Sequence, residues 1–405
     1  MFYEILIVTL LGIFAGIFTG LIPGIHINLV AIMVLSSSMF LLNYFSPLSL
    51  ALFIVAMSIT HTFLDSIPSI FLGAPDSGLE LSVLPGHKLL LEGRGYEAVF
   101  LTVIGSFFAV VSALFFTPVL IPLIKYGYPL IEDYIPHILI VFSVILVWRE
   151  KKSRIKALMM YLLSGLLGLA VLTFYGSDVF TLEQPLFPML SGLFGTSILI
   201  VSLMEKTKIP EQKITYPKLK IEEVLSYLGL GFVASLLTGT LPGLGASQAA
   251  IMSSSVKKKN KPENFLILLG SINTVVMVVS FISLYSIDKA RNGSVLVISK
   301  ILGEFNLSHL FLFLFVSLFV AGIASFLALK ISKTFSKVMS KVNYAKICLS
   351  VISLIVIMAF IISGPFGLFV LIVSTFLGIT ASFMGIGKNH LMGCLLFPII
   401  LFFLL

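Results

Sequence analysis

The stretch T-G-L-I-P-G-I-H-I-N-L-V-A-I-M, residues 19–33, has an altered copy in T-G-T-L-P-G-L-G-A-S-Q-A-A-I-M, residues 238–252. Thr, Gly, Pro, Gly, Ala, Ile and Met match at one offset, and each copy lies inside a long apolar run. Because proline lacks an N–H and glycine adopts unusual dihedral angles, each Pro-Gly pair is expected to interrupt a helix. Lipid cannot satisfy the freed backbone groups, so two matched breaks predict an internal repeat with a functional loop in each half. The alternative is that Pro and Gly are simply frequent in membrane helices.

The composition is that of a protein with many membrane spans. Hydrophobic residues make up 58% of the 405 residues and charged residues 11%, against about 25% charged residues in soluble domains. The length can hold roughly a dozen spans of about 20 residues. The first residues carry Glu4 and no basic region, so we expect the N-terminus to be retained. Cys348 and Cys394 lie in separate apolar segments, where packing is the expected role.

The net charge of +8 is spread over short loops, which is typical of cytoplasmic loops and not of a nucleic-acid-binding surface. Basic segments at 205–220 and 256–261 bracket the second Pro-Gly segment. That segment is therefore expected to enter and leave the membrane on the cytoplasmic side as a re-entrant hairpin. Counting spans backward makes the first hairpin enter from outside, and it places both termini of the chain outside the cell membrane.

We therefore predict an all-α polytopic membrane protein with two inverted-topology repeats, each a re-entrant Pro-Gly helical hairpin plus about five transmembrane helices. The first repeat covers residues 1–204 with its hairpin at 3–42, and the second covers 222–405 with its hairpin at 222–256. A basic cytoplasmic linker, 205–221, joins them. The remaining spans are expected at 47–72, 98–124, 134–149, 156–175, 186–204, 263–287, 309–330, 345–363, 367–387 and 389–405.

The two Pro-Gly tips are expected to meet near the middle of the membrane. A half-helix that begins after each tip would point its free N–H groups and partial positive charge there, so an anion is the natural ligand. The alternative is that the polar side chains near the tips only satisfy freed backbone groups. The candidate substrate-binding residues are Thr19, Gly20, Pro23, Gly24, His26, Asn28, Thr238, Gly239, Pro242, Gly243, Gly245, Ser247, Gln248 and Asn273.

A second group of polar residues follows the first hairpin in S-I-T-H-T-F-L-D-S, residues 58–66. His61 and Asp65 are four apart and share a helix face, so they could pair. An ionisable couple inside a membrane is a candidate proton relay or counter-ion; the alternative is a structural pair near the membrane edge. The corresponding G-S-I-N-T, residues 270–274, contains Asn273 and no charge. The two halves are therefore expected to differ in function.

The most polar stretch is residues 73–98, which is rich in turn residues and faces the cytoplasm in this topology. Asp76, His87, Lys88 and Arg94 could form a vestibule or gate there, or the stretch could be a plain solvated loop. The segment G-I-G-K-N-H, residues 385–390, is interpreted as a short cytoplasmic turn.

These motifs resemble the large membrane subunit of the tripartite tricarboxylate transporters. The resemblance rests on I-P-G-I-H, on L-P-G-L-G-A-S, and on I-P-S-I-F-L-G-A-P-D-S-G followed by P-G-H-K-L-L-L-E-G-R-G-Y-E-A, and it covers about residues 10–100 and 225–280. His26 stands where that family usually has a second glycine, and T-H-T-F-L-D replaces its tyrosine-glycine-glycine element. The chain is also short for the family, so it resembles a divergent, archaeal-type member, and citrate-like substrates do not follow.

The resemblance implies uptake of a carboxylate driven by an ion gradient, with a small membrane subunit and an extracellular binding protein as partners. Na+ or H+ would be the coupling ion, and no metal site or cofactor is expected. The runner-up is a polyprenyl-phosphate flippase that binds the lipid phosphate with the same loops. An intramembrane enzyme using His61 and Asp65 is disfavoured, because no H-E-x-x-H or G-x-S-x-G motif accompanies them. Substrate, coupling ion, transport direction and assembly as a homo-oligomer are left open.

Overall fold

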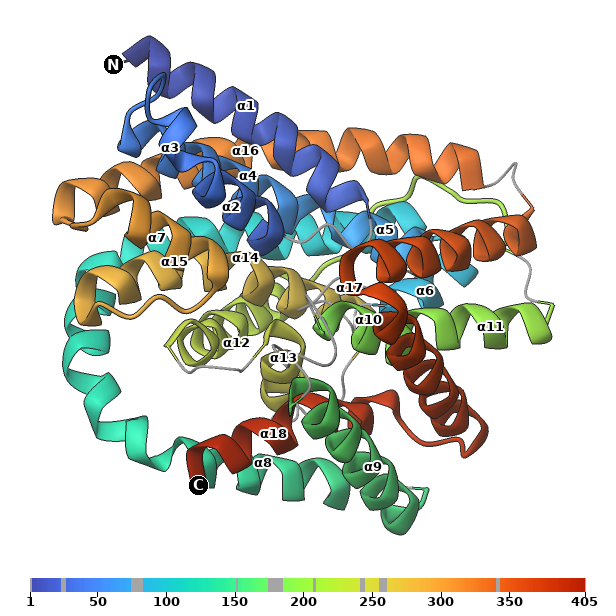
Figure 1. The fold of residues 1–405 in the computed structure, drawn as a ribbon. Helices are drawn as coiled ribbons and strands as arrows, with labels where there is room; N and C mark the ends of the chain where they lie inside the picture. The colour runs from blue at the N-terminus through green and yellow to red at the C-terminus, as the bar shows by residue number, and fades with distance from the viewer. Residues whose placement is uncertain are drawn as a thin grey trace.

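The structure is a computed structural model, and it describes residues 2–22, 27–73, 83–150, 152–173, 185–206, 209–240, 245–254, 261–339 and 343–404. Within these ranges the regular secondary structure is helical throughout (Figure 1). Nine of the described helical segments are long and apolar enough to cross a membrane. The predicted class, an all-helical polytopic membrane protein, is confirmed.

The helices of the first half are α1 (Phe2–Leu21), α2 (Ile27–Ser36), α3 (Ser38–Leu41), α4 (Pro47–Leu64), α5 (Ser66–Phe71), α6 (Val83–Leu91), α7 (Gly95–Ile131), α8 (Ile135–Trp148), α9 (Arg154–Thr173), α10 (Leu186–Leu190) and α11 (Ser197–Met204). Those of the second half are α12 (Ile221–Thr240), α13 (Ala246–Ser254), α14 (Pro262–Ile287), α15 (Gly293–Leu302), α16 (Leu307–Met339), α17 (Tyr344–Phe383) and α18 (Gly393–Leu404). A π-helical turn, Ser191–Thr196, joins α10 to α11. Short 3₁₀ turns, Glu132–Tyr134 and Lys388–Met392, precede α8 and α18.

Helix α1 packs closely along α4, and the two helices run in the same direction. Their contacts advance together: a Cβ atom added at Gly16 would come within 2.5 Å of Thr60, and one added at Gly20 within 2.8 Å of Leu64. Small residues at such contacts let the two backbones approach.

The starts of α1 and α4 are also neighbours. The Glu4 carboxylate accepts hydrogen bonds from Ser46 N (3.2 Å) and Ser49 Oγ (2.7 Å) at the beginning of α4. Ser46 also caps α4, because its side chain accepts a bond from Ser49 N. The chain between α1 and α4 therefore returns to the side on which α1 begins.

The second half repeats this parallel pairing with α12 and α14. A Cβ atom at Gly231 would meet Ser271, and one at Gly239 would lie 2.4 Å from Val279. At the start of the pair, the Glu223 carboxylate accepts a hydrogen bond from Asn264 Nδ2 (3.2 Å). The chain between α12 and α14 thus also returns to the side on which α12 begins.

Helices α7 and α14 form the most extensive pair, and they run in the same direction. Arg94 at the start of α7 pairs with Glu263 at the start of α14 (2.9 Å). Beyond the other ends, Lys289 pairs with Glu132. Between these two ion pairs, Ser106 Oγ of α7 donates to the Gly270 carbonyl of α14 (2.9 Å).

Helix α4 runs opposite to α7, and therefore opposite to α14. The Phe71 ring, at the end of α5, lies where a Cβ atom on Gly95 would meet it at 2.8 Å. Farther along α7, Thr102 Oγ1 donates to Ser66 Oγ at the start of α5 (3.2 Å). Later residues of α4–α5 therefore contact earlier residues of α7, so these helices are antiparallel. Because α7 and α14 run in the same direction, the α1–α4 pair and the α12–α14 pair point in opposite directions.

Helices α4 and α14 occupy the centre of the bundle. Their most apolar windows are each 83% buried, against 39% for α1 and 28% for α12 and α17. Helix α16 covers α4 and α7 on another side. In Figure 1 the helices α8, α9 and α18 form a separate group below this centre.

Helix α17 is interrupted at Gly364, whose φ of 64° and ψ of −166° are not helical, and Pro365 follows it, so two helices meet at a kink between the segments expected at 345–363 and 367–387. Other elements differ from the predicted spans. Helix α15 occupies 293–302, where no span is predicted. Part of the polar stretch 73–98 folds into α6, where His87 is buried and its Nε2 lies 3.1 Å from the Tyr344 hydroxyl, so residues 83–98 are not a plain solvated loop. Asp76 lies outside the described residues.

Candidate functional site

The candidate site is bordered by the helix ends on either side of the two Pro-Gly breaks. Pro23, Gly24, His26, Pro242 and Gly243 lie outside the described residues, as does the Gln248 side chain. Helix α1 ends at Leu21 and α2 begins at Ile27, and α12 ends at Thr240 and α13 begins at Ala246. The described residues therefore place the four helix ends that border the breaks.

At the end of α1, Thr19 is hydrogen-bonded to His61 of α4. Both side chains are buried, and His61 Nδ1 lies 3.1 Å from Thr19 Oγ1. The Thr19 hydroxyl also lies 3.3 Å from the Gly16 carbonyl, to which it can donate. The tautomer of the His61 ring sets whether Nδ1 donates to this hydroxyl or accepts from it.

One turn further on, Asp65 is bonded to a residue of the other half. Asn273 of α14 donates through Nδ2 to Asp65 Oδ2 (2.8 Å) and to the Thr62 carbonyl (3.3 Å). Asp65 is buried and Asn273 half-buried. A hydrogen bond to a charged carboxylate is worth about 1.5–3 kcal/mol. This contact joins the two central, oppositely directed helices beside the end of α1.

His61 and Asp65 share one end of α4, as their spacing predicts. The Asp65 backbone N–H donates to the His61 carbonyl (2.9 Å), so the helix continues between them. Their side chains extend the cluster in two directions, His61 to Thr19 on α1 and Asp65 to Asn273 on α14. The cluster thereby connects the first break to the second half of the chain, and the role of the couple in ion coupling stays a prediction.

The remaining predicted residues have structural contacts that sequence reasoning did not identify. Asn28 Oδ1 accepts a hydrogen bond from Ser294 N (3.0 Å) at the first turn of α15. Thr238 Oγ1 donates to the Ala234 carbonyl within its own helix (2.6 Å). The Gly239 carbonyl accepts from Ser283 Oγ (2.9 Å).

Two predicted residues lie at the start of the half-helix after the second break. Gly245 is half-buried, and its carbonyl accepts the Ala249 N–H (3.2 Å) in the first turn of α13. Ser247 is completely buried two residues later. The described start of α13 is thus enclosed by protein, as a half-helix beside a site requires.

The ends of α1 and α12 reach different levels of the bundle. Gly20 contacts Leu64, next to Asp65, whose partner on α14 is Asn273. Gly239 contacts Val279 of the same helix. The six residues from Asn273 to Val279 correspond to about 9 Å along the helix axis. The meeting of the two tips stays a prediction, since both tips lie outside the described residues.

A buried lysine near the C-terminus was not singled out from the sequence. Lys388 is 5% exposed, and its Nζ donates to Ser197 Oγ (2.7 Å) directly after the π-helical turn. The nearby hydroxyls of Thr196 and Thr375 bond to each other, which links the turn to α17. The segment 385–390, interpreted as a short turn, thus carries a buried ammonium. The available signal was a single lysine immediately before an apolar span, without the basic neighbours of an orienting loop.

Replacing Lys388 by methionine is expected to stabilise the protein by about 1 kcal/mol, because methionine is similar in volume and removes a desolvated charge. Thermal unfolding of the purified variant measures this effect. Lys346→Met is the matched control, since Lys346 is exposed at the start of α17 and should leave the unfolding temperature unchanged. A lower unfolding temperature for Lys388→Met would contradict the prediction and make the lysine a structural requirement.

Comparison with known proteins decides the family. Residues 6–393 match the profile described as "Tripartite tricarboxylate transporter TctA family". The chain belongs to this family. "Uncharacterized protein MJ1079" of Methanocaldococcus jannaschii is 30% identical over 409 residues, which cover 98% of this chain and 99% of that protein. No solved structure matches.

The TctA match confirms the resemblance and extends it beyond the motifs that suggested it. Those motifs lie within about residues 10–100 and 225–280, whereas the family match runs almost from end to end. TctA proteins are transporter subunits and not enzymes. His61 and Asp65 therefore belong to a membrane permease, which agrees with the expectation that this chain catalyses no covalent chemistry.

Proposed function

We propose that this TctA-family chain takes up a small organic anion, a carboxylate, using an ion gradient, with the site between the two Pro-Gly segments. The observation that carries the proposal is the hydrogen bond between Asp65 and Asn273, which joins the two halves beside the end of α1. An intramembrane carboxylate with a partner across a repeat interface is expected at a transport site.

The proposed architecture is a pair of inverted repeats, each beginning with a re-entrant hairpin, α1–α2 and α12–α13. Two features support it: each first arm runs parallel to the central helix that follows, and the two pairs point in opposite directions. In this arrangement α2 and α13 begin at the breaks and direct their N-terminal N–H groups to the bound anion.

His61 and Asp65 are the proposed coupling residues. Protons would be carried by the His61 ring, and sodium would be held by the Asp65 carboxylate together with backbone carbonyls of the breaks. A small membrane subunit and an extracellular binding protein are the proposed partners of the TctA-type permease, with both termini of this chain on the outer side.

The proposal is tested by thermal unfolding of the purified protein with di- and tricarboxylates, with and without sodium and at two pH values. A ligand that binds only the folded state raises the unfolding temperature by mass action. Stabilisation by a carboxylate that depends on sodium or protons supports the proposal and identifies the coupling ion. Stabilisation by short polyprenyl phosphates alone would replace it with the flippase alternative.

The paired breaks make a prediction of their own for uptake into proteoliposomes. Replacing Pro23-Gly24 or Pro242-Gly243 by Ala-Ala is expected to reduce uptake at least about tenfold in both cases, since continuous helices would fill the breaks and remove the free N–H groups. The variants should remain monodisperse in detergent. Normal uptake by either variant would refute the paired-loop site.

A further inference from the structure

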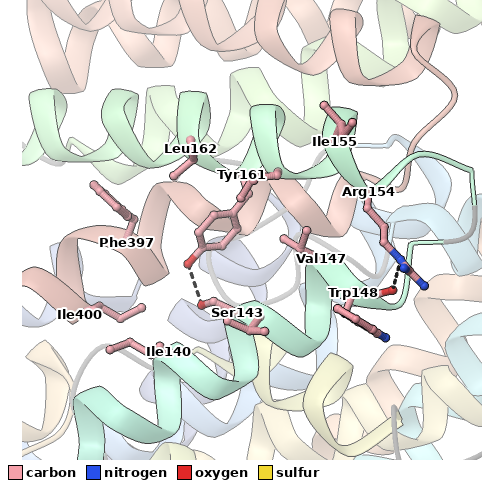
Figure 2. A pocket seen from close by; sticks show the side chains of 12 residues that line it. Ile140, Ser143, Val147, Trp148, Arg154, Ile155, Tyr161, Leu162, Phe397 and Ile400 are labelled. Carbon is pink, nitrogen blue, oxygen red and sulfur yellow. Dashed lines mark hydrogen bonds between the residues drawn. The ribbon is translucent and has the colours of Figure 1, made fainter.

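An apolar groove lies on the outside of the bundle between α8, α9 and α18, away from the central polar cluster. Its volume is about 450 Å³, and Val144, Leu158, Leu162, Phe397 and Ile400 are among the side chains that line it. Figure 2 shows these helices converging on the groove.

The polar atoms inside the groove are already satisfied by protein. The Tyr161 hydroxyl donates to Ser143 Oγ (2.7 Å), and Ser143 in turn donates to the Leu139 carbonyl (2.8 Å) (Figure 2). The interior of the groove is therefore suited to hydrocarbon and not to a polar solute.

One end of the groove is aromatic and basic. The Arg154 guanidinium lies 4.5 Å from the centroid of the Trp148 ring, and its Nε donates to the Trp148 carbonyl (3.0 Å) (Figure 2). Within the part of the chain that the structure describes, Arg154 forms no ion pair with a carboxylate. Its remaining guanidinium N–H groups are thus available to an anion.

A polar hollow continues from this end and contains Arg149, Lys152 and Arg154. The acidic residue of the hollow, Glu150, is directed inward: its Oε2 accepts from His390 Nε2 (2.9 Å), and its Oε1 accepts from the Lys152 backbone N–H (3.0 Å). Three basic side chains therefore face one carboxylate that is already engaged, and the hollow carries a net positive charge.

We propose that this groove and hollow bind an anionic phospholipid of the surrounding bilayer. An acyl chain lies along the apolar groove, the phosphate is held by Arg154 with Lys152, and Trp148 lies at headgroup depth. Basic pockets between membrane helices on the cytoplasmic side suit anionic headgroups, and tryptophan is enriched at that interface. A protein helix is a poorer match, because a narrow apolar groove that ends in a concentrated positive charge corresponds to a chain with a charged head.

The tryptophan makes this proposal directly measurable. Trp148 is the single tryptophan of the chain, so its fluorescence reports on this groove alone. The full-length protein is reconstituted in phosphatidylcholine bilayers, and quenching is measured with brominated phosphatidylglycerol and with brominated phosphatidylcholine. We expect phosphatidylglycerol to bind at least about tenfold more tightly, since each basic residue near an anionic headgroup contributes about fivefold.

Variants separate the headgroup contact from general lipid contact. The Arg154→Gln substitution is expected to reduce the preference for phosphatidylglycerol over phosphatidylcholine about fivefold. The Arg154→Lys substitution is expected to keep most of this preference. Lys156→Gln is the matched control, because Lys156 is exposed on the same helix but lines neither the groove nor the hollow. Quenching is expressed relative to unbrominated lipid, which corrects for the lost contact between Arg154 and the ring.

Two results would overturn the proposal. Equal quenching by both headgroups in the unaltered protein would assign the groove to unselective lipid or to a protein partner. An unchanged preference in Arg154→Gln, or an equal loss in Lys156→Gln, would remove the phosphate contact from this site. Size-exclusion chromatography verifies that each variant is folded, and Arg154→Lys supplies the comparison if Arg154→Gln is not.

Discussion

Uptake by the Asp65→Asn protein is expected to fall at least about hundredfold. Asparagine keeps the shape of the side chain, and its carbonyl oxygen can still accept the bond that Asn273 Nδ2 gives to Asp65 at 2.8 Å. What disappears is the negative charge. A carboxylate and a monovalent cation about 4 Å apart attract by about 4 kcal/mol at an effective dielectric constant of about 20. Losing that attraction removes the coupling ion from a buried site.

Uptake into proteoliposomes under an imposed sodium or proton gradient measures this effect, with thermal unfolding run in parallel. The unfolding temperature should change little, because the hydrogen bond survives. Asp133→Asn is the control, since Asp133 is exposed in the turn between α7 and α8 and should transport normally. Uptake by Asp65→Asn within twofold of the unaltered protein would exclude Asp65 from ion coupling.

A large loss of stability is expected for Gly270→Ala, at about 3 kcal/mol. A Cβ atom on Gly270 would come within 2.3 Å of the Thr102 carbonyl oxygen, and backbone cannot rotate away as a side chain can. The two helices must separate to admit it. The hydrogen bond from Ser106 Oγ to the Gly270 carbonyl would stretch at the same time.

The loss should appear as a lower unfolding temperature in detergent and a smaller monodisperse fraction. Gly322→Ala is the matched control: it lies in α16, is exposed, and has open space around an added Cβ atom. Alanine there favours the helix by up to about 1 kcal/mol. If Gly270→Ala were as stable as the control, the contact between α7 and α14 would be looser than described.

Composition and periodicity predicted the class of fold because they report on lipid exposure. Long apolar runs with few charges mark helices that must cross hydrocarbon, and nine such helices are present among the described residues. The bend at Gly364 lies between the two spans predicted from either side of it. In contrast, α15 escaped prediction because a 10-residue apolar segment is too short to be recognised as a span.

The candidate site was only partly accessible to sequence reasoning. The spacing of His61 and Asp65 placed both at one end of α4, and symmetry identified Asn273 as the corresponding residue of the second half. The partners Thr19 and Asn273 depend on how helices distant in sequence pack, which periodicity does not determine. The same holds for Asn28 at α15 and for Lys388 at Ser197, where a polar residue finds its partner across the bundle.

The central position of α4 has a consequence for how the chain is made. Helix α14 packs against α4, and its Asn273 bonds to Asp65. The ribosome adds Asn273 more than two hundred residues after Asp65. Until then, the polar end of α4 lacks this cross-bundle partner. The first half therefore cannot complete this polar cluster before α14 has emerged.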